Sequence, residues 1–248
     1  MNSGKRHTFS VSLESWGYSH AGNVKSENQD SFLNWAEGQL WAVADGVGSH
    51  EASGAASKMI MEMLMQVSEP ESLGTHIANV NRQLESANNL LMSQKAATGK
   101  MAASTIVTLA MHGGMAACIW AGDSRCYLLR GSILYQCSKD HSLRQEKIDN
   151  RELTRFEAHR MVKGNIITNA VGVKTPLSLG KEIFPVRAGD RFLLCTDGLT
   201  NLLSPEALIT YLSRQSAKET VEGIAETLED MLQPDNITFV IVFISELE

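Results

Sequence analysis

Cysteine is scarce in this 248-residue sequence, which contains four. Cys118, Cys126, Cys137 and Cys195 lie in or beside apolar runs, and no two are spaced as a C-x-x-C pair. Cysteines paired at short spacing are typical of structural zinc sites and of disulfide-stabilised secreted domains. Their absence argues against both classes and favours buried free thiols in a reducing compartment.

Long hydrophobic runs are also missing. Residues 1–20 contain no apolar stretch of the length found in signal peptides. The longest apolar run, residues 239–244, is far shorter than the roughly 20 residues that cross a bilayer. We therefore expect a soluble, cytoplasmic protein with no membrane partner.

Basic residues are too few and too dispersed for a nucleic-acid-binding surface. The chain has 22 Lys and Arg against 28 Asp and Glu, a net charge of −6, and no dense basic block. An anionic substrate still fits this balance, because bound divalent cations reverse the sign of an acidic site. Nothing in the composition indicates an obligate oligomer, so we expect a monomer.

The residues present are those of an ordinary globular chain, 43% hydrophobic and 20% charged. No repeat, low-complexity tract or linker divides it, which predicts a single domain over residues 1–248. The expected strands come mostly as hairpins and the helices in pairs, an order that favours antiparallel sheets covered by helices. We predict strands over residues 9–20, 31–35, 40–44, 102–111, 115–121, 126–129, 133–136, 192–195 and 237–244. We predict helices over residues 51–66, 72–92, 205–213 and 217–231.

Four aspartates stand at the boundaries of expected strands: Asp45, Asp123, Asp197 and Asp235. The first three each neighbour a glycine, and an Asp-Gly pair after a strand is most often a turn. Four such acids in one domain also suit a divalent-cation site, because carboxylates that meet at a sheet edge repel one another unless a cation neutralises them. Oxygen ligands favour Mg²⁺ or Mn²⁺ over Zn²⁺. Spacing alone leaves a cation site and a set of ordinary turns both open.

Short motifs follow one another in order from residue 22 to residue 238. They are GNVKSENQD (22–30), VADGVG (43–48), AST (103–105), AGDSRCYL (121–128), DHSL (140–143), IITNAVG (166–172), LCTDGL (194–199) and DNIT (235–238). A lone Asp-Gly pair is not specific, but this ordered set resembles the metal-dependent (PPM, type 2C) serine/threonine protein phosphatases in their short bacterial single-domain form. The resemblance implies an α+β fold, a four-layer α/β/β/α sandwich of two antiparallel sheets flanked by pairs of helices.

The resemblance also implies a site for two Mn²⁺ or Mg²⁺ ions. It assigns Asp45 as the carboxylate that bridges the ions, with the Gly46 carbonyl on one of them. Asp197 and Asp235 complete the other metal site, and Asp30 holds metal-bound waters.

Three further features of the site follow from the same resemblance. Asp123 corresponds to the ligand of a third, weaker ion shared with Asp197. Lys25 stands where the family usually has an arginine that contacts the substrate phosphate, and a lysine cannot make the bidentate contact of a guanidinium. The charged segment at about 141–165 corresponds to a flap beside the cleft.

The implied reaction is hydrolysis of phosphoserine and phosphothreonine in proteins by direct attack of a metal-bridging hydroxide. The implied substrates are phosphoproteins, among them a cognate bacterial Ser/Thr kinase or its targets, and type VI secretion is one process that such enzymes regulate. Two alternatives are a catalytically inactive phosphoprotein-binding module and a hydrolase of small phosphorylated metabolites. Inactive relatives normally lose metal-binding acids, whereas Asp45, Asp197 and Asp235 are all present.

Overall fold

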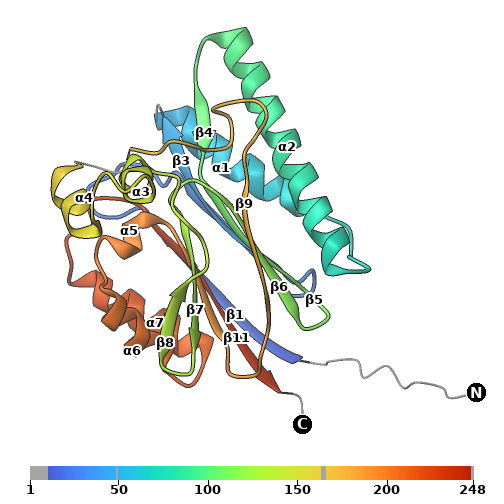
Figure 1. Ribbon diagram of the computed structural model, residues 1–248, viewed down its shortest axis with the longest axis vertical. Coiled ribbons are helices and arrows are strands. Elements are labelled where there is room, and N and C mark those ends of the chain that lie inside the picture. Colours follow the sequence, from blue (N-terminus) through green and yellow to red (C-terminus); the bar gives the residue numbers. More distant parts are fainter. Residues whose placement is uncertain (1–10, 49, 163–165, 247–248) are drawn as a thin grey trace, which may run out of the picture.

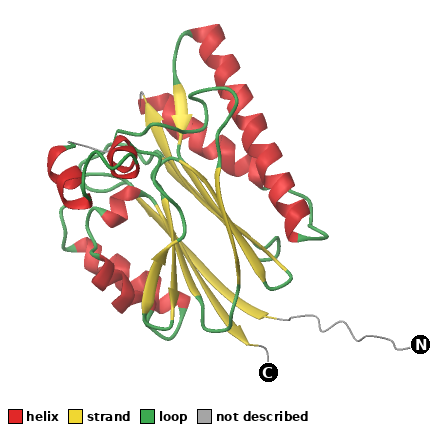
Figure 2. Ribbon diagram, in the orientation of Figure 1, coloured by secondary structure: helices red, strands yellow, loops and turns green. Residues whose placement is uncertain are grey.

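The computed structural model describes residues 11–48, 50–162 and 166–246. They form two antiparallel β-sheets packed face to face, with helices on both outer faces (Figures 1 and 2). The predicted four-layer α/β/β/α sandwich is therefore confirmed.

The first sheet contains five strands and the second contains six. The first has the order β1 (Val11–His20), β11 (Ile237–Glu246), β10 (Arg191–Cys195), β7 (Arg125–Arg130) and β8 (Ile133–Gln136). The second has the order β2 (Asp30–Trp35), β3 (Leu40–Gly48), β5 (Ile106–His112), β6 (Met115–Ala121) and β9 (Gly180–Pro185), with β4 (Ala102–Ser104) paired to β3.

Successive side chains of the strands belong alternately to different layers of the core. In β3, Trp41 and Val43 pack between the two sheets, where they meet β10 and β11 residues such as Phe192. Their neighbours Leu40 and Ala42 face the helices instead. Successive side chains of a strand point to opposite faces, so a strand covered on both faces is apolar at every position.

Two groups of helices cover the outer faces. The second sheet is covered by α1 (His50–Leu64) and α2 (Leu73–Thr98). The first is covered by α5 (Asp197–Thr200), α6 (Pro205–Leu212) and α7 (Ala217–Glu229). The charged segment contributes the short helices α3 (Leu143–Asp149) and α4 (Arg155–Met161). A flap is predicted for this segment, and its residues 163–165 lie outside the described part of the chain.

The helix starts follow local sequence signals. Ser204 accepts a hydrogen bond from the backbone N–H of Ala207, and Pro205 occupies the first helical turn of α6. The side chain of an N-cap serine satisfies a backbone donor that the helix leaves unpaired, and proline has no N–H to leave unpaired. The predicted start of this helix is confirmed.

Several predicted boundaries were wrong. Strand β3 does not end at Ala44 but continues to Gly48, because Gly46 and Gly48 pair with β4. The expected strand 102–111 is interrupted at Thr105. Helix α2 extends to Thr98, and β9 was not predicted because its residues are mostly exposed and lack an apolar pattern. Asp45 is therefore a residue within a strand and not a strand-end residue.

In the described ranges, no helix has the length and apolar character needed to cross a bilayer. The four cysteines are free thiols, three of them buried, as their spacing predicted.

Candidate active site

Asp30 and Asp45 lie directly opposite each other on the neighbouring strands β2 and β3. The main chain of Asp45 is held on both sides: its N–H donates to Thr105 Oγ1 (3.0 Å), and its carbonyl accepts from Thr105 N (2.8 Å) and Ser104 Oγ (2.9 Å). Thr105 Oγ1 is in turn 2.7 Å from Ser124 Oγ. The interruption between β4 and β5 thus places a hydroxyl under Asp45 and connects it to the turn that carries Asp123.

Gly46, the next residue, requires glycine for steric reasons. Its N–H donates to the carbonyl of Gln29 at 3.2 Å. A Cβ at this position would lie 2.4 Å from the backbone oxygen of Ser53, a contact that no side chain tolerates. The backbone of β3 can therefore approach the start of α1 closely at this point.

The second sheet meets the first at Asp30. Thr196 Oγ1 donates to Asp30 Oδ2 at 3.0 Å, and Thr196 N donates to the carbonyl of Thr238 at 2.9 Å. Thr196 lies next to Asp197 in the sequence, and Thr238 lies near Asp235. The two hydrogen bonds of Thr196 therefore connect the three segments that carry Asp30, Asp197 and Asp235. Sequence reasoning missed both threonines. The available signal for Thr196 was its position directly before Asp197.

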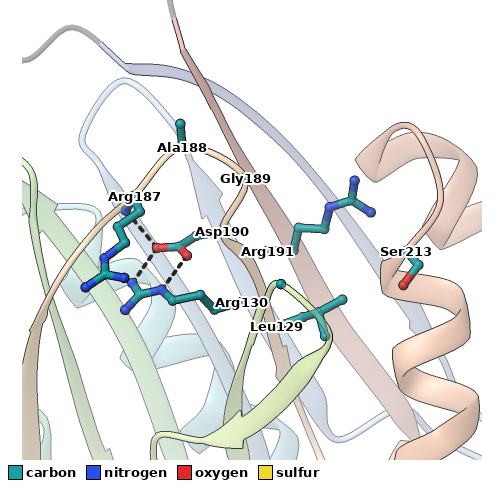
Figure 3. A pocket seen from close by; sticks show the side chains of 9 residues that line it. Leu129, Arg130, Arg187, Ala188, Gly189, Asp190, Arg191 and Ser213 are labelled. Atoms are coloured by element: carbon teal, nitrogen blue, oxygen red, sulfur yellow. Dashed lines mark hydrogen bonds and ion pairs between the residues drawn. The ribbon is translucent and has the colours of Figure 1, made fainter.

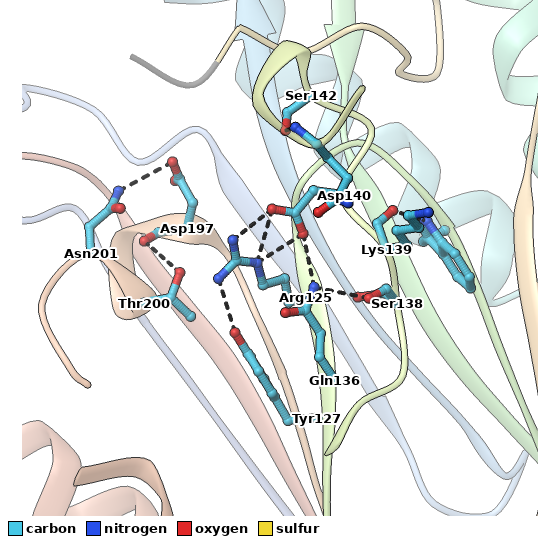
Figure 4. A network of polar contacts seen from close by, with 12 residues as sticks. Arg125, Tyr127, Gln136, Ser138, Lys139, Asp140, Ser142, Asp197, Thr200 and Asn201 are labelled. Carbon is cyan, nitrogen blue, oxygen red and sulfur yellow. Dashed lines mark hydrogen bonds and ion pairs between the residues drawn. The ribbon is translucent and has the colours of Figure 1, made fainter. Parts of the chain in front are cut away.

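Asp197 lies in the first turn of α5 rather than in a simple turn after β10. Its Oδ2 accepts from Asn201 Nδ2 at 3.3 Å, and its carbonyl accepts from Thr200 Oγ1 at 3.2 Å (Figure 4). The next residue, Gly198, packs against the loop before β11, where a Cβ would lie 2.0 Å from the carbonyl oxygen of Asn236. This close approach brings the Asp197 and Asp235 segments together.

Asn236 holds the segment that carries Asp235, and Lys25 forms an ion pair with the Asp235 carboxylate. Asn236 donates from Nδ2 to the carbonyls of Ala21 (2.8 Å) and Glu27 (2.9 Å), and its Oδ1 accepts from Gln29 N (2.9 Å). Asn236 thus links the Asp235 segment to the backbone of residues 21–29. Lys25 Nζ lies 3.3 Å from Asp235 Oδ1, so the loop lysine is at the site.

Asp123 lies beside a rigid ion pair. Arg125 forms a fork with Asp140, with Nε–Oδ1 at 2.9 Å and Nη2–Oδ2 at 2.6 Å, and its Nη1 donates to the Tyr127 hydroxyl (Figure 4). His141 has a structural role here, because its Nδ1 accepts from Gly122 N at 3.3 Å.

The aspartates brought together in this way raise one another's pKa. Burial, together with the charges of Asp197 and Asp235, raises the pKa of Asp30 to about 7 against the lowering effect of its threonine hydrogen bonds. Burial, followed by the charge of Asp197, raises the pKa of Asp123 to about 7. The pKa of Asp45 is raised well above its ordinary value by burial and then by the charges of other acids, with Asp30 first. Buried carboxylates that share a site show this behaviour when no cation neutralises them.

The donor set fits hard divalent cations. The acids that act on Asp45 are Asp30, Asp123, Asp197 and Asp235, and all of them offer oxygen ligands. Within the described ranges, no group of three or more His, Cys, Asp or Glu side chains converges closely enough to hold a metal by itself. The carboxylates thus influence one another's pKa without converging on a single point. Their suitability for divalent cations rests on their oxygen ligands and on their mutual repulsion.

Comparison with known proteins identifies the family of this chain. The family model described as Protein phosphatase 2C matches residues 16–233. The chain belongs to this family. The PP2C assignment confirms the resemblance given by the sequence motifs.

Curated PP2C relatives are similar over most of this chain. The serine/threonine protein phosphatase PstP of Mycobacterium tuberculosis is 30% identical over 90% of the chain, which spans 43% of that protein's length. The serine/threonine phosphatase stp of Listeria monocytogenes is 28% identical over 89% of the chain, and here the chain spans 92% of the relative.

Solved structures agree on the fold. PppA, described as a key regulatory component of T6SS in Pseudomonas aeruginosa, superposes with a TM-score of 0.85 at 36% identity over 94% of this chain and 99% of that one. The catalytic domain of PstP in complex with two manganese ions superposes with a TM-score of 0.84 at 28% identity over 96% of this chain and all of that one. Manganese is therefore present in a similar protein.

Proposed function

We propose that this PP2C-family chain is a Mn²⁺- or Mg²⁺-dependent phosphatase that acts on phosphoserine and phosphothreonine in proteins. The observation that carries the proposal is the convergence of aspartates from separate segments: Asp30 lies opposite Asp45, Thr196 beside Asp197 donates to Asp30, and Gly198 packs against the segment that carries Asp235. Asp30 and Asp123 are buried, and placing like charges so close together destabilises a fold, so such a cluster is maintained where cations or a reaction require it. The named phosphatase relatives support the same conclusion.

Each residue has a role in this proposal. Asp45 would bridge two ions, and the Gly46 carbonyl would bind one of them. Asp197 and Asp235 would hold the other ion. When bound, the ions supply the activation of water and the neutralisation of phosphoryl charge.

The remaining site residues act around this centre. Asp30, fixed by Thr196, would orient water at the ions through its second oxygen. Asp123 would serve with Asp197 at a third, weaker ion. The ammonium of Lys25 has three donors, so it can keep its contact with Asp235 and also donate to a substrate phosphate. The flap segment, with α3 and α4, would border the bound phosphoprotein.

Hydrolysis of p-nitrophenyl phosphate and of a phosphothreonine peptide, measured with and without Mn²⁺, tests the proposal. We expect turnover only with the metal, and a loss of at least a hundredfold in Asp197→Asn. The matched control is Asp230→Asn, an aspartate at the exposed end of α7. Activity without metal, or equal activity in Asp197→Asn and Asp230→Asn, would contradict the proposal.

The main alternative is a catalytically inactive module that binds phosphoproteins on the same fold. The presence of Asp30, Asp45, Asp123, Asp197 and Asp235 in one coupled cluster disfavours it, because binding alone does not require a cluster that destabilises the protein. Binding of a phosphopeptide without any metal-dependent turnover would favour the alternative.

We further infer that the substrates include a bacterial Ser/Thr kinase or its targets, and that type VI secretion is the regulated process. The similarity to PppA supports this inference. Incubation of the metal-loaded enzyme with the autophosphorylated kinase encoded nearest to its gene, followed by mass spectrometry, tests it. Unchanged phosphothreonine on both the kinase and its targets would refute the assignment.

We also propose that residues 1–248 form one domain and that the protein is a monomer. Light scattering is expected to give a mass near 27.1 kDa, and thermal unfolding a single cooperative transition.

A further inference from the structure

A pocket of about 430 Å³ opens at the end of the first sheet remote from the candidate active site. It is lined by the turn between β7 and β8, by the turn before β10, and by Ser213 at the end of α6 (Figure 3). Strands β7 and β10 connect the two ends of the sheet: Arg125 and Cys195 lie towards the aspartates, and Arg130 and Arg191 line the pocket. Since Arg191 and Cys195 are the two ends of the five-residue strand β10, roughly 13 Å of strand separates them.

A buried carboxylate fixes the shape of this pocket. Asp190 is 1% exposed and forms a fork with Arg130, with Nε–Oδ1 at 2.8 Å and Nη2–Oδ2 at 2.7 Å. The backbone N–H of Arg187 donates to Asp190 Oδ2 at 2.8 Å, which closes the turn. Arg130 also donates to the carbonyl of Pro185 at 2.8 Å. The turn is therefore locked to the neighbouring hairpin.

The pocket has more positive charge than its own acid neutralises. Arg130, Arg187 and Arg191 line it against Asp190 alone, which leaves a formal charge of +2 in a chain whose net charge is −6. Within residues 11–48, 50–162 and 166–246, no carboxylate forms an ion pair with Arg187 or Arg191. In Figure 3 the Arg187 and Arg130 side chains extend to the same side of Asp190, so their like charges are not separated by the fold.

Arg191 forms the opposite wall and is held by neutral groups. Its Nη1 donates to the carbonyls of Leu212 and Arg214, and its guanidinium lies 4.5 Å from the centre of the Phe243 ring. Burial lowers the pKa of this guanidinium, as expected for a cation that no anion compensates. These contacts orient Arg191 without neutralising it.

We propose that this pocket is a second anion site, which binds a small phosphoryl dianion, either inorganic phosphate or the phosphate of a small monoester. Guanidinium groups bind phosphate oxygens with paired hydrogen bonds, and the formal charge of +2 matches a phosphate dianion. The volume lies in the range of small-molecule sites. Leu129 is the one large apolar side chain of the lining, which disfavours an aromatic or lipid ligand. The proposal is independent of the catalytic assignment.

Calorimetric titration of the Mn²⁺-loaded protein with inorganic phosphate tests the second site, with Arg187→Gln as the main variant. We expect Arg187→Gln to lose one phosphate per chain, or to weaken that site at least tenfold. Arg187→Lys, which keeps the charge, should retain most of the binding. The constant for phosphate inhibition of hydrolysis should stay within twofold of the wild-type value in both variants, because Arg187 lies at the other end of the sheet from the candidate active site.

Arg82→Gln, on α2 of the opposite outer layer, is the matched control and should titrate as wild type. Equal titrations of wild type and Arg187→Gln would overturn the proposal, whether or not the protein proves to be a phosphatase. Propylphosphonate, which resists hydrolysis, separates the two sources: tighter binding than inorganic phosphate assigns a monoester, and weaker binding assigns free phosphate. Succinate binding as tightly as phosphate would overturn the phosphoryl assignment.

Discussion

Replacing Asp45 by asparagine should stabilise the metal-free protein while abolishing its activity. Asp45 lies opposite Asp30 across β2 and β3, and burial with the charges of neighbouring acids raises its pKa. At pH 8 the folded protein must therefore hold repelling carboxylates that are far apart in the unfolded chain. Asparagine has nearly the same shape as aspartate but carries no charge, so the substitution removes this repulsion.

The magnitude follows from the strand geometry. Directly opposed residues of antiparallel strands have Cβ atoms about 5 Å apart, which puts the two carboxylate charges about 6 Å apart. At an effective dielectric constant of about 20, this pair costs about 3 kcal/mol. Allowing for relaxation, we expect a gain of about 2 kcal/mol, or about 4–8 °C in Tm for a domain of this size.

The assay is thermal unfolding at pH 8 of protein treated with chelator, followed by the same measurement in Mn²⁺. Metal-free Asp45→Asn should melt above wild type, and saturating Mn²⁺ should reverse the order, because only wild type gains from binding. Asp140→Asn is the matched control, for which we expect Tm to change in the opposite direction. It removes the partner of Arg125 and should lower Tm, at a cost of about 2–3 kcal/mol.

The reasoning would be refuted if metal-free Asp45→Asn melted at or below the temperature of wild type. That result would mean that Asp45 makes net favourable contacts in the metal-free fold, and that the coupling of the aspartates is not a stability cost. Stabilisation by Mn²⁺ that was equal in both proteins would separately refute the placement of Asp45 at the ions.

Three further predictions concern neighbouring groups. Lys25→Arg should lower KM severalfold with little change in kcat, because a guanidinium can contact both phosphate oxygens; an unchanged KM would rule out Lys25 as the phosphate contact. Asn236→Ala should cost about 2–3 kcal/mol of unfolding free energy, measured by urea titration, because one buried and two partly buried hydrogen bonds are lost. The metal-free protein should lose stability as pH rises from about 4 to about 7. The raised pKa values of Asp30 and Asp123, about 7 each, mean that the fold retains protons that the unfolded chain has released, so a Tm that rises over this interval would contradict the assignment.

The residue pattern predicted most of the strands and helices correctly because apolar periodicity reflects burial directly. It failed where pairing depends on a distant partner. Gly46 breaks local strand propensity, yet β3 continues because β4 pairs with it from some 60 residues away. Strand β9 is mostly exposed, so it has no apolar pattern, and its position is set by pairing with β6.

Sequence by itself identified the family through motifs in fixed order, and it named the aspartates, because the chemistry of a carboxylate is visible in one letter. The tertiary structure decided which groups act on one another. Asp45 meets Asp30 across two strands, Thr196 holds Asp30 from the other sheet, and Lys25 reaches Asp235. The arginine pocket likewise depends on a turn locked between residues 130 and 190. Interaction energies depend on distance and burial, and only folding sets these for residues far apart in the chain.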